Sequence, residues 1–154
     1  MFRIKRMILA LLFCALFVPV VGGNDLDLTI VYDNNPYNEE LETRWGFSCV
    51  VEGSEKTIIF DVGGEGSVLL RNMEKLKINS KVIDIIVLSH IHYDHIGALS
   101  TFLKENPDVV VYMPGSFPKS VKEDVKRVGA RLVEVRGPIR ICKDVYSTGE
   151  DRKS

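Results

Sequence analysis

All three histidines of this 154-residue chain lie within six consecutive positions, and a carboxylate lies among them. Imidazole nitrogens and carboxylate oxygens are ligands that Zn²⁺ takes in proteins, and iron or manganese would also accept them. A lone histidine, or one His-x-His pair, is more often a surface or core feature than a ligand. Four donors so close together, between an apolar run and a glycine, instead favour a metal site. The segment reads His90-Ile91-His92-Tyr93-Asp94-His95.

The spacing of these donors suggests how they would share two metal ions. If the strand expected over residues 82–89 stays extended, His90 and His92 point to the same face, because side chains alternate along a strand. Two imidazoles on one face can then bind one ion. Asp94 and His95 follow where the chain must turn, so their side chains could bind a second ion beside the first.

Apolar and β-branched runs alternate with turn residues along the rest of the chain and predict an α/β fold, antiparallel hairpin strands followed by βαβαβ. The expected strands span residues 26–32, 45–51, 57–62, 83–88, 109–113, 132–135 and 139–145. One expected helix begins after Ser67, a good N-cap, and two more span residues 96–104 and 118–128. Such sheets carry their sites at the carboxyl ends of strands, where both the histidine motif and Asp61 fall.

The pattern His90-x-His92-x-Asp94-His95 resembles the signature of the metallo-β-lactamase-fold hydrolases. Flanking segments are similar to those of one subgroup, which includes archaeal and bacterial proteins similar to the dihydropterin-forming synthase of methanopterin biosynthesis. The resemblance covers about residues 26–149, and the flanking segments are less specific than the motif. These segments are Asp33-Asn34-Asn35, Trp45-Gly46-Phe47-Ser48-Cys49, Ile58-Ile59-Phe60-Asp61-Val62-Gly63 and Leu88-Ser89-His90.

The resemblance implies an αββα sandwich with two metal ions, most simply zinc. In that family His90 and His92 would bind the first ion, and Asp94 and His95 the second. Hydroxide held between the ions would be the nucleophile, because metal binding lowers the pKa of water from 15.7 to about 7. Asp94 would also orient this hydroxide, as the catalytic carboxylate. Two interpretations of Asp61 stay open: a carboxylate that fixes a ligand from behind, or a turn residue at a strand end.

The chain departs from the family pattern after the motif. The family's complete site takes one more histidine for each metal and an aspartate that bridges both, but no histidine follows His95. We therefore expect the amino-terminal half of the fold, from a hydrolase that is truncated or completed by a partner chain. The alternative is a non-catalytic remnant or interaction module that retains the motif. For the hydrolase, the subgroup points to a phosphorylated or pterin-like small-molecule substrate, with a lactam, thioester or phosphoester left open.

The first 23 residues have the composition of a secretory signal peptide. Arg3, Lys5 and Arg6 precede an apolar stretch, residues 7–21, that ends at Gly22-Gly23. This stretch of 15 residues is shorter than the roughly 20 that a membrane-spanning helix needs. We therefore expect an exported protein with a metallo-β-lactamase-like domain over residues 24–154. The alternative is a membrane anchor formed by an uncleaved leader.

Removal of the leader would change the formal charge from −1 to −4, which argues against a nucleic-acid partner. The remaining domain would keep Cys49 and Cys142, which we interpret as buried free thiols. A disulfide between them stays open, because export permits one but nothing in the sequence brings the two together. Cys142 is disfavoured as a metal ligand, since Ile141 and Val145 give it apolar surroundings.

Overall fold

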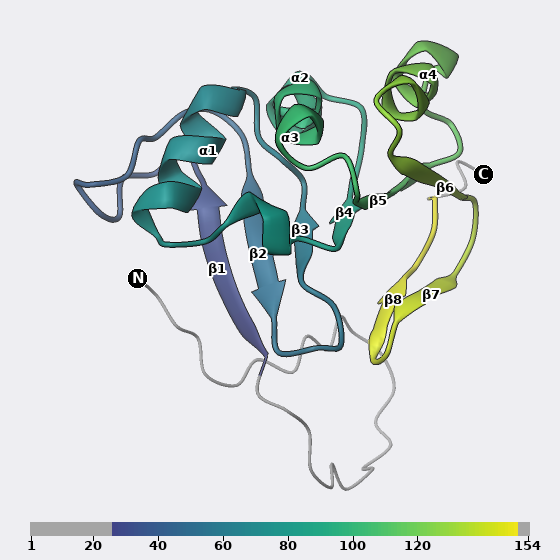
Figure 1. Cartoon of the computed structure of the whole chain (residues 1–154), viewed down its shortest axis with the longest axis horizontal. Coiled ribbons are helices and arrows are strands. Elements are labelled where there is room, and N and C mark those ends of the chain that lie inside the picture. Colours follow the sequence, from purple (N-terminus) through teal and green to yellow (C-terminus); the bar gives the residue numbers. More distant parts are fainter. Residues whose placement is uncertain (1–25, 151–154) are drawn as a thin grey trace, which may run out of the picture.

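An antiparallel meander of three strands opens the sheet, as the sequence predicts. In the computed structural model, which describes residues 26–150, β1 (Asp27–Tyr32) pairs with β2 (Ser48–Glu52), and β2 pairs with β3 (Ile58–Phe60). Gly53, between β2 and β3, has φ 96°, a left-handed conformation that glycine adopts without steric cost. The meander forms one side of the sheet in Figure 1.

Three parallel strands continue the sheet in chain order, and each crossover between them passes through a helix. Figure 1 shows these helices gathered over one face of the sheet. The α/β class, hairpin strands followed by βαβαβ, is therefore confirmed. The elements are α1 (Gly66–Lys75), the 3-10 turn η1 (Ser80–Val82), β4 (Ile85–Val87), α3 (Leu99–Glu105), β5 (Val110–Pro114), α4 (Lys119–Arg127) and β6 (Arg131–Val135).

The two faces of the sheet are covered by different elements. On the helical face, Ile59 and Ile86 of the central strands belong to one core with Leu69 of α1 and Phe102 of α3, and all four are fully buried. On the opposite face, Ile58 and Ile85 pack with a residue from a separate hairpin, Cys142. This hairpin consists of β7 (Ile139–Cys142) and β8 (Val145–Ser147), drawn in yellow in Figure 1.

The hairpin leaves part of the second face open. Ile30 pairs with Cys49, and Cys49 pairs with Phe60, so these three side chains lie on the same face. Ile30 is 49% exposed and Phe60 is 36% exposed. The described chain therefore presents apolar side chains to solvent on the β1 side of this face.

The last apolar run was predicted as one strand, and that prediction is wrong. Residues 139–145 instead turn back on themselves, since Cys142 pairs with Val145. The turn residues between them are Lys143 and Asp144, and Asp144 has φ 61°. Aspartate is among the few non-glycine residues enriched in this left-handed region. Asp144 was therefore the residue in the sequence that indicated a turn here.

The histidine motif also has a different local structure from the one predicted. β4 ends at Val87, so His90 and His92 do not extend a strand, and the alternation argument does not apply. The helix expected over 96–104 is two helices, α2 (Tyr93–Ile96) and α3, with Gly97 between them. A Cβ at Gly97 would lie 2.2 Å from the Gly64 carbonyl oxygen, so another loop passes against the chain there.

Two further sequence predictions concern the N-cap of α1 and the leader segment. Ser67 lies inside α1, and the N-cap is Glu65, whose side chain makes no capping hydrogen bond. The predicted signal peptide, residues 1–23, lies outside the described residues. Within residues 26–150, none of the helices has the length and apolar character that crossing a membrane requires.

Asn72 of α1 connects the helix to the meander and to the loop that follows β1. Its side chain is 1% exposed. The amide nitrogen donates to the carbonyls of Val31, at 3.0 Å, and Glu42, at 2.8 Å, while the amide oxygen accepts from the Glu42 N–H at 2.9 Å. Three backbone groups would lose their partner without this one side chain.

Replacing Asn72 with alanine should therefore lower the free energy of unfolding by about 2–4 kcal/mol, because buried backbone groups lose their hydrogen bonds. Urea unfolding followed by circular dichroism measures this. Glu74→Ala, at an exposed position of the same helix, is the matched control and should change stability by less than about 0.5 kcal/mol. Equal effects of the two substitutions would contradict the role assigned to Asn72.

Candidate metal centre

β3 ends in a turn that brings Asp61 to the carboxyl edge of the sheet. Asp61 has φ 52°, and its N–H donates to the Val87 carbonyl, at the end of β4, at 2.9 Å. The next N–H, of Val62, donates to the His95 carbonyl at 2.9 Å. Main-chain hydrogen bonds thus join this turn both to β4 and to the histidine motif.

Gly63 and Gly64 follow Val62, and Gly63 packs on the ring of Tyr32. Gly63 has φ 70°, and a Cβ there would lie 2.6 Å from the ring of Tyr32. The Tyr32 hydroxyl accepts a hydrogen bond from the Glu65 N–H at 3.2 Å. Burial raises the pKa of Tyr32, so the hydroxyl stays neutral at physiological pH. Only glycine fits at position 63 without displacing this ring.

The carboxylate of Asp61 is 1% exposed and accepts three hydrogen bonds. One oxygen accepts from the Ser89 N–H at 2.8 Å, and the other accepts from the Ser89 hydroxyl at 2.6 Å and from His95 Nδ1 at 2.7 Å. Because a carboxylate oxygen accepts, Nδ1 of His95 donates, and the lone pair of this imidazole lies on Nε2. Nε2 is 3.5 Å from Oδ2 of Asp94.

The three imidazoles form one cluster. The ring centroids of His90 and His95 are 4.1 Å apart, and those of His90 and His92 are 4.7 Å apart. Burial lowers the pKa of His90, and the neighbouring His95 and His92 lower it further. A lowered pKa keeps the His90 imidazole neutral, which is the form that binds a metal.

The donor set fits a divalent metal ion. One ligand atom from each of Asp61, His90 and His95 lies within 4.8 Å of the other two. His92, which is exposed, and Asp94, which is half-buried, flank this group. The structure therefore gathers all four residues of the predicted ligand set and Asp61 at one edge of the sheet. Their division between two ions stays a prediction.

Two features of this site go beyond the sequence prediction. Asp61 was open to two interpretations, and the structure shows both properties: it ends a strand, and its carboxylate holds His95. Ser89 was not singled out, although its hydroxyl lies 2.6 Å from Asp61 and 2.8 Å from Nδ1 of His90. The sequence feature that could have identified Ser89 is its position between a buried strand and the first histidine.

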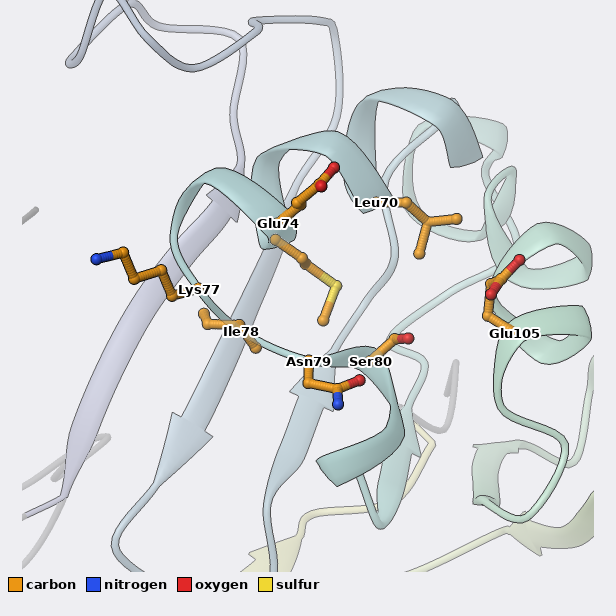
Figure 2. A pocket seen from close by; sticks show the side chains of 8 residues that line it. Leu70, Glu74, Lys77, Ile78, Asn79, Ser80 and Glu105 are labelled. Carbon is orange, nitrogen blue, oxygen red and sulfur yellow. The ribbon is translucent and has the colours of Figure 1, made fainter.

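The described chain has cavities both near the site and far from it. One of about 210 Å³ borders Ser89, and another of about 550 Å³ lies between the end of α1 and α3. Figure 2 shows the second cavity, whose lining includes the carboxylates of Glu74 and Glu105 but no histidine or cysteine. It therefore lacks the donors of the histidine cluster.

Both described cysteines are free and buried, as expected from the sequence. Cys142 packs with Ile58 and Ile85 on the hairpin face, and it is not part of the donor group around His90. Burial raises the pKa of Cys49 to about 11, and the nearby charge of Asp61 adds to this effect. Its thiol is therefore protonated at neutral pH.

Comparison with known proteins relates this chain to one superfamily. A family model described as the metallo-beta-lactamase superfamily matches residues 46–152. The 7,8-dihydropterin-6-methyl-4-(beta-D-ribofuranosyl)-aminobenzene-5'-phosphate synthase of Methanocaldococcus jannaschii is 33% identical in an alignment that covers 79% of this chain and 49% of the synthase. An uncharacterised protein of the same organism is 30% identical in an alignment that covers 79% of this chain and 52% of that protein. The chain thus spans about half the length of these relatives.

Solved structures share the fold. Tm1679, a metal-dependent hydrolase of the beta-lactamase superfamily, superposes with a TM-score of 0.58 at 23% identity, over 77% of this chain and 46% of that chain. The metallo-beta-lactamase fold protein YhfI from Bacillus subtilis gives a TM-score of 0.55 at 14% identity, over 75% of this chain and 48% of that chain. At these identities the likeness shows a common fold.

The raised pKa of Cys49 predicts a thiol that resists alkylation. At pH 8 about 0.1% of a thiol with a pKa near 11 is thiolate, against roughly a quarter of one with an ordinary pKa of 8.5. Iodoacetamide should therefore modify Cys49 at least 100-fold more slowly in the folded chain than in 8 M urea, as measured by peptide mass spectrometry. Raising the pH from 8 to 9 should increase the folded rate about ten-fold, and a rate that is already constant over this range would contradict the prediction.

Proposed function

Because this chain belongs to the metallo-β-lactamase superfamily, we propose that it forms the metal-binding part of a metal-dependent hydrolase with a dinuclear zinc site. The observation that carries this proposal is the orientation of His95. Asp61 accepts the hydrogen bond from Nδ1 and so leaves Nε2 to bind a metal, within reach of Asp94 and beside His90. A carboxylate behind an imidazole is the usual arrangement around a metal-bound histidine.

In this proposal each residue of the motif has a separate role. His90 and His92 bind the first ion, and Asp94 and His95 bind the second. Asp61 already accepts three hydrogen bonds, so it acts behind His95 and keeps this imidazole in one tautomer. Asp94, whose Oδ2 lies 3.5 Å from Nε2 of His95, is the carboxylate that orients the attacking water. When bound, the metal would lower the pKa of a coordinated water from 15.7 to about 7 and so supply hydroxide at neutral pH.

The four ligands of the histidine motif do not complete the coordination shells of two metal ions. The chain contains three histidines, and all of them lie in the motif. Four ligands shared between two ions give each ion two protein ligands, where zinc takes three or four. We therefore propose that further ligands come from polypeptide beyond these residues, in the same protein or in a partner chain. The greater length of the relatives supports this.

For the substrate we propose a phosphorylated or pterin-like small molecule. The support is the 33% identity to a protein named as a 7,8-dihydropterin-6-methyl-4-(beta-D-ribofuranosyl)-aminobenzene-5'-phosphate synthase, in an alignment that covers 79% of this chain. A lactam, thioester or phosphoester stays open, as does an exported location for the protein. An interaction module without activity is the second candidate, favoured by the exposed Ile30 and Phe60 on the open face of the sheet.

Zinc binding distinguishes the two candidates. The purified chain should bind Zn²⁺ at pH 7.5 with the modest affinity of an incomplete ligand set, and His92→Ala should lower this affinity at least ten-fold because one ligand is lost. Competition with a chromophoric chelator measures this affinity. Ile91→Ala, at an exposed neighbouring position without a donor, is the matched control and should leave the affinity unchanged. A chain for which this titration detects no zinc binding would favour the interaction module.

Asp61→Asn tests whether this residue acts behind His95. Asparagine tolerates the same backbone conformation, but it replaces one carboxylate oxygen by an amide nitrogen that cannot accept from His95. Zinc affinity should fall about 10–100-fold. The matched control is Asp84→Asn, since Asp84 likewise accepts from a backbone N–H, that of Thr57, at 2.9 Å, and it should not change the affinity. A complete loss of zinc binding would make Asp61 a direct ligand instead.

A further inference from the structure

A chain of hydrogen bonds links Asp61 to two of the three histidines. Nδ1 of His95 donates directly to Oδ2 of Asp61 at 2.7 Å. The hydroxyl of Ser89 donates to the same oxygen at 2.6 Å, and it lies 2.8 Å from Nδ1 of His90. Ser89 therefore lies between the carboxylate and His90, and the proposed function has given this residue no role so far.

We propose that Ser89 is a positioning residue for His90, through which a single oxygen of Asp61 fixes one imidazole of each metal ion. The carboxylate acts on His95 directly and on His90 through the Ser89 hydroxyl. This inference rests on the proposed dinuclear site. It adds a link between the two metal positions that is already present in the metal-free chain.

The number of hydrogens between these groups determines the tautomer of His90. A carboxylate oxygen accepts, so the single hydrogen of the Ser89 hydroxyl lies between Ser89 and Asp61. The hydroxyl oxygen then has only lone pairs to offer, and its contact with His90 is a hydrogen bond only if Nδ1 donates. A neutral imidazole with its hydrogen on Nδ1 has its lone pair on Nε2, where it can bind a metal.

The opposite orientation of the hydroxyl is unfavourable at both of its contacts. If its hydrogen turned toward His90, the oxygens of Ser89 and Asp61 would face each other at 2.6 Å with no hydrogen between them. A hydrogen bond to a charged acceptor is also stronger than one to a neutral ring nitrogen. In this orientation neutral His90 would carry its hydrogen on Nε2, which could not bind a metal. The hydroxyl thus selects the form of His90 that leaves Nε2 free.

The two imidazoles held in this way lie close enough to serve adjacent ions. Their ring centroids are 4.1 Å apart, and the metal ions of two-metal sites lie about 3.5–4 Å apart. With both hydrogens on Nδ1, His90 and His95 each present a lone pair on Nε2. One carboxylate oxygen therefore prepares a ligand for each of the two ions.

The position of the Ser89 hydroxyl is fixed by a second bond to the same carboxylate. The Ser89 N–H donates to Oδ1 of Asp61 at 2.8 Å, so both the main chain and the side chain of Ser89 are bonded to Asp61. Ser89 itself is exposed in the described chain. Water can therefore reach Nδ1 of His90 once the hydroxyl is removed. A variant without the hydroxyl should fold, and only the preference for one tautomer should be lost.

Nitrogen chemical shifts of the histidine side chains test the proposal without metal. The chain is labelled with ¹⁵N-histidine and kept in EDTA at pH 8, where the lowered pKa of His90 makes this imidazole neutral. Long-range ¹H–¹⁵N correlation spectra then show which ring nitrogen carries the hydrogen, and His90→Gln and His95→Gln assign the signals. In the unsubstituted chain both imidazoles should carry it on Nδ1.

Variants then assign the effect to the hydroxyl. Ser89→Ala should spread the hydrogen of His90 over both ring nitrogens, because water can donate to Nδ1 as well as accept from it. His95 should not change, since it is bonded to Asp61 directly. Ser89→Thr keeps the hydroxyl and should retain the original tautomer. The matched control is Ser48→Ala, since the Ser48 hydroxyl donates to the Asp61 carbonyl at 2.8 Å but, among the described residues, bonds to no histidine.

Zinc titration measures what the tautomer contributes to the proposed site. With the same chromophoric chelator, Ser89→Ala should lower zinc affinity about ten-fold, the smaller of the effects seen when the partner behind a metal-bound histidine is removed. Ser89→Thr and Ser48→Ala should both keep the original affinity. A loss in Ser89→Ala with recovery in Ser89→Thr would support the positioning role.

A hydrogen on Nε2 of His90 in the unsubstituted chain would overturn the proposal, and this result needs no variant. So would an unchanged tautomer or an unchanged zinc affinity in Ser89→Ala, an equal change in Ser48→Ala, or no recovery in Ser89→Thr. The tautomer measurements contain no metal, so their failure leaves the hydrolase proposal intact. Conversely, a chain without detectable zinc binding would remove the hydrolase proposal, while the spectra would still show whether Ser89 fixes His90.

Discussion

The buried carboxylate of Asp61 is the interaction on which the arrangement of the site depends. Its three hydrogen bonds join the loop after β3 to the loop after β4, at Ser89 and at His95. Hydrogen bonds to a charged group contribute roughly 1.5–3 kcal/mol each, whereas a left-handed non-glycine residue costs about 1–2 kcal/mol. The bonds therefore outweigh the strain of φ 52° at Asp61. Without the carboxylate, nothing else described would hold the His95 ring by its Nδ1.

Close backbone packing supports this interaction. Gly63 and Gly97 lie where a side chain would strike the Tyr32 ring and the Gly64 carbonyl oxygen, at 2.6 and 2.2 Å from the added Cβ. The loops can approach this closely because these positions have no side chain. The Ala98 N–H also donates to the Gly63 carbonyl at 3.1 Å, so that the start of α3 is held against the same turn. The imidazoles are thus placed by rigid main chain, which is what a metal site of defined geometry requires.

The two faces of the sheet are covered unequally, in a chain that spans about half the length of its relatives. The helical face is filled by α1 and α3, whereas within residues 26–150 the other face has only the β7–β8 hairpin over its centre. Ile30, at 49% exposure, and Phe60, at 36%, are the consequence. The metal donors lie at one edge of this sheet, where loops of the chain meet. A sheet that exposes apolar side chains next to its candidate site is suited to further polypeptide on that face.

The sequence by itself determined the class of the fold, the family and the cluster of donors, because these depend on local patterns. Alternating apolar runs separated by turn residues predicted the strands, and four donors in six positions predicted the metal site. Only the tertiary structure decided how the donors meet. β4 ends at Val87, so strand alternation does not align His90 with His92, and their contact arises from loop packing instead. Likewise Asp61 and Ser89 are 28 positions apart, and no local pattern reports a hydrogen bond over that separation. A contact between distant segments depends on the paths of both loops, which the fold sets and short-range sequence patterns do not.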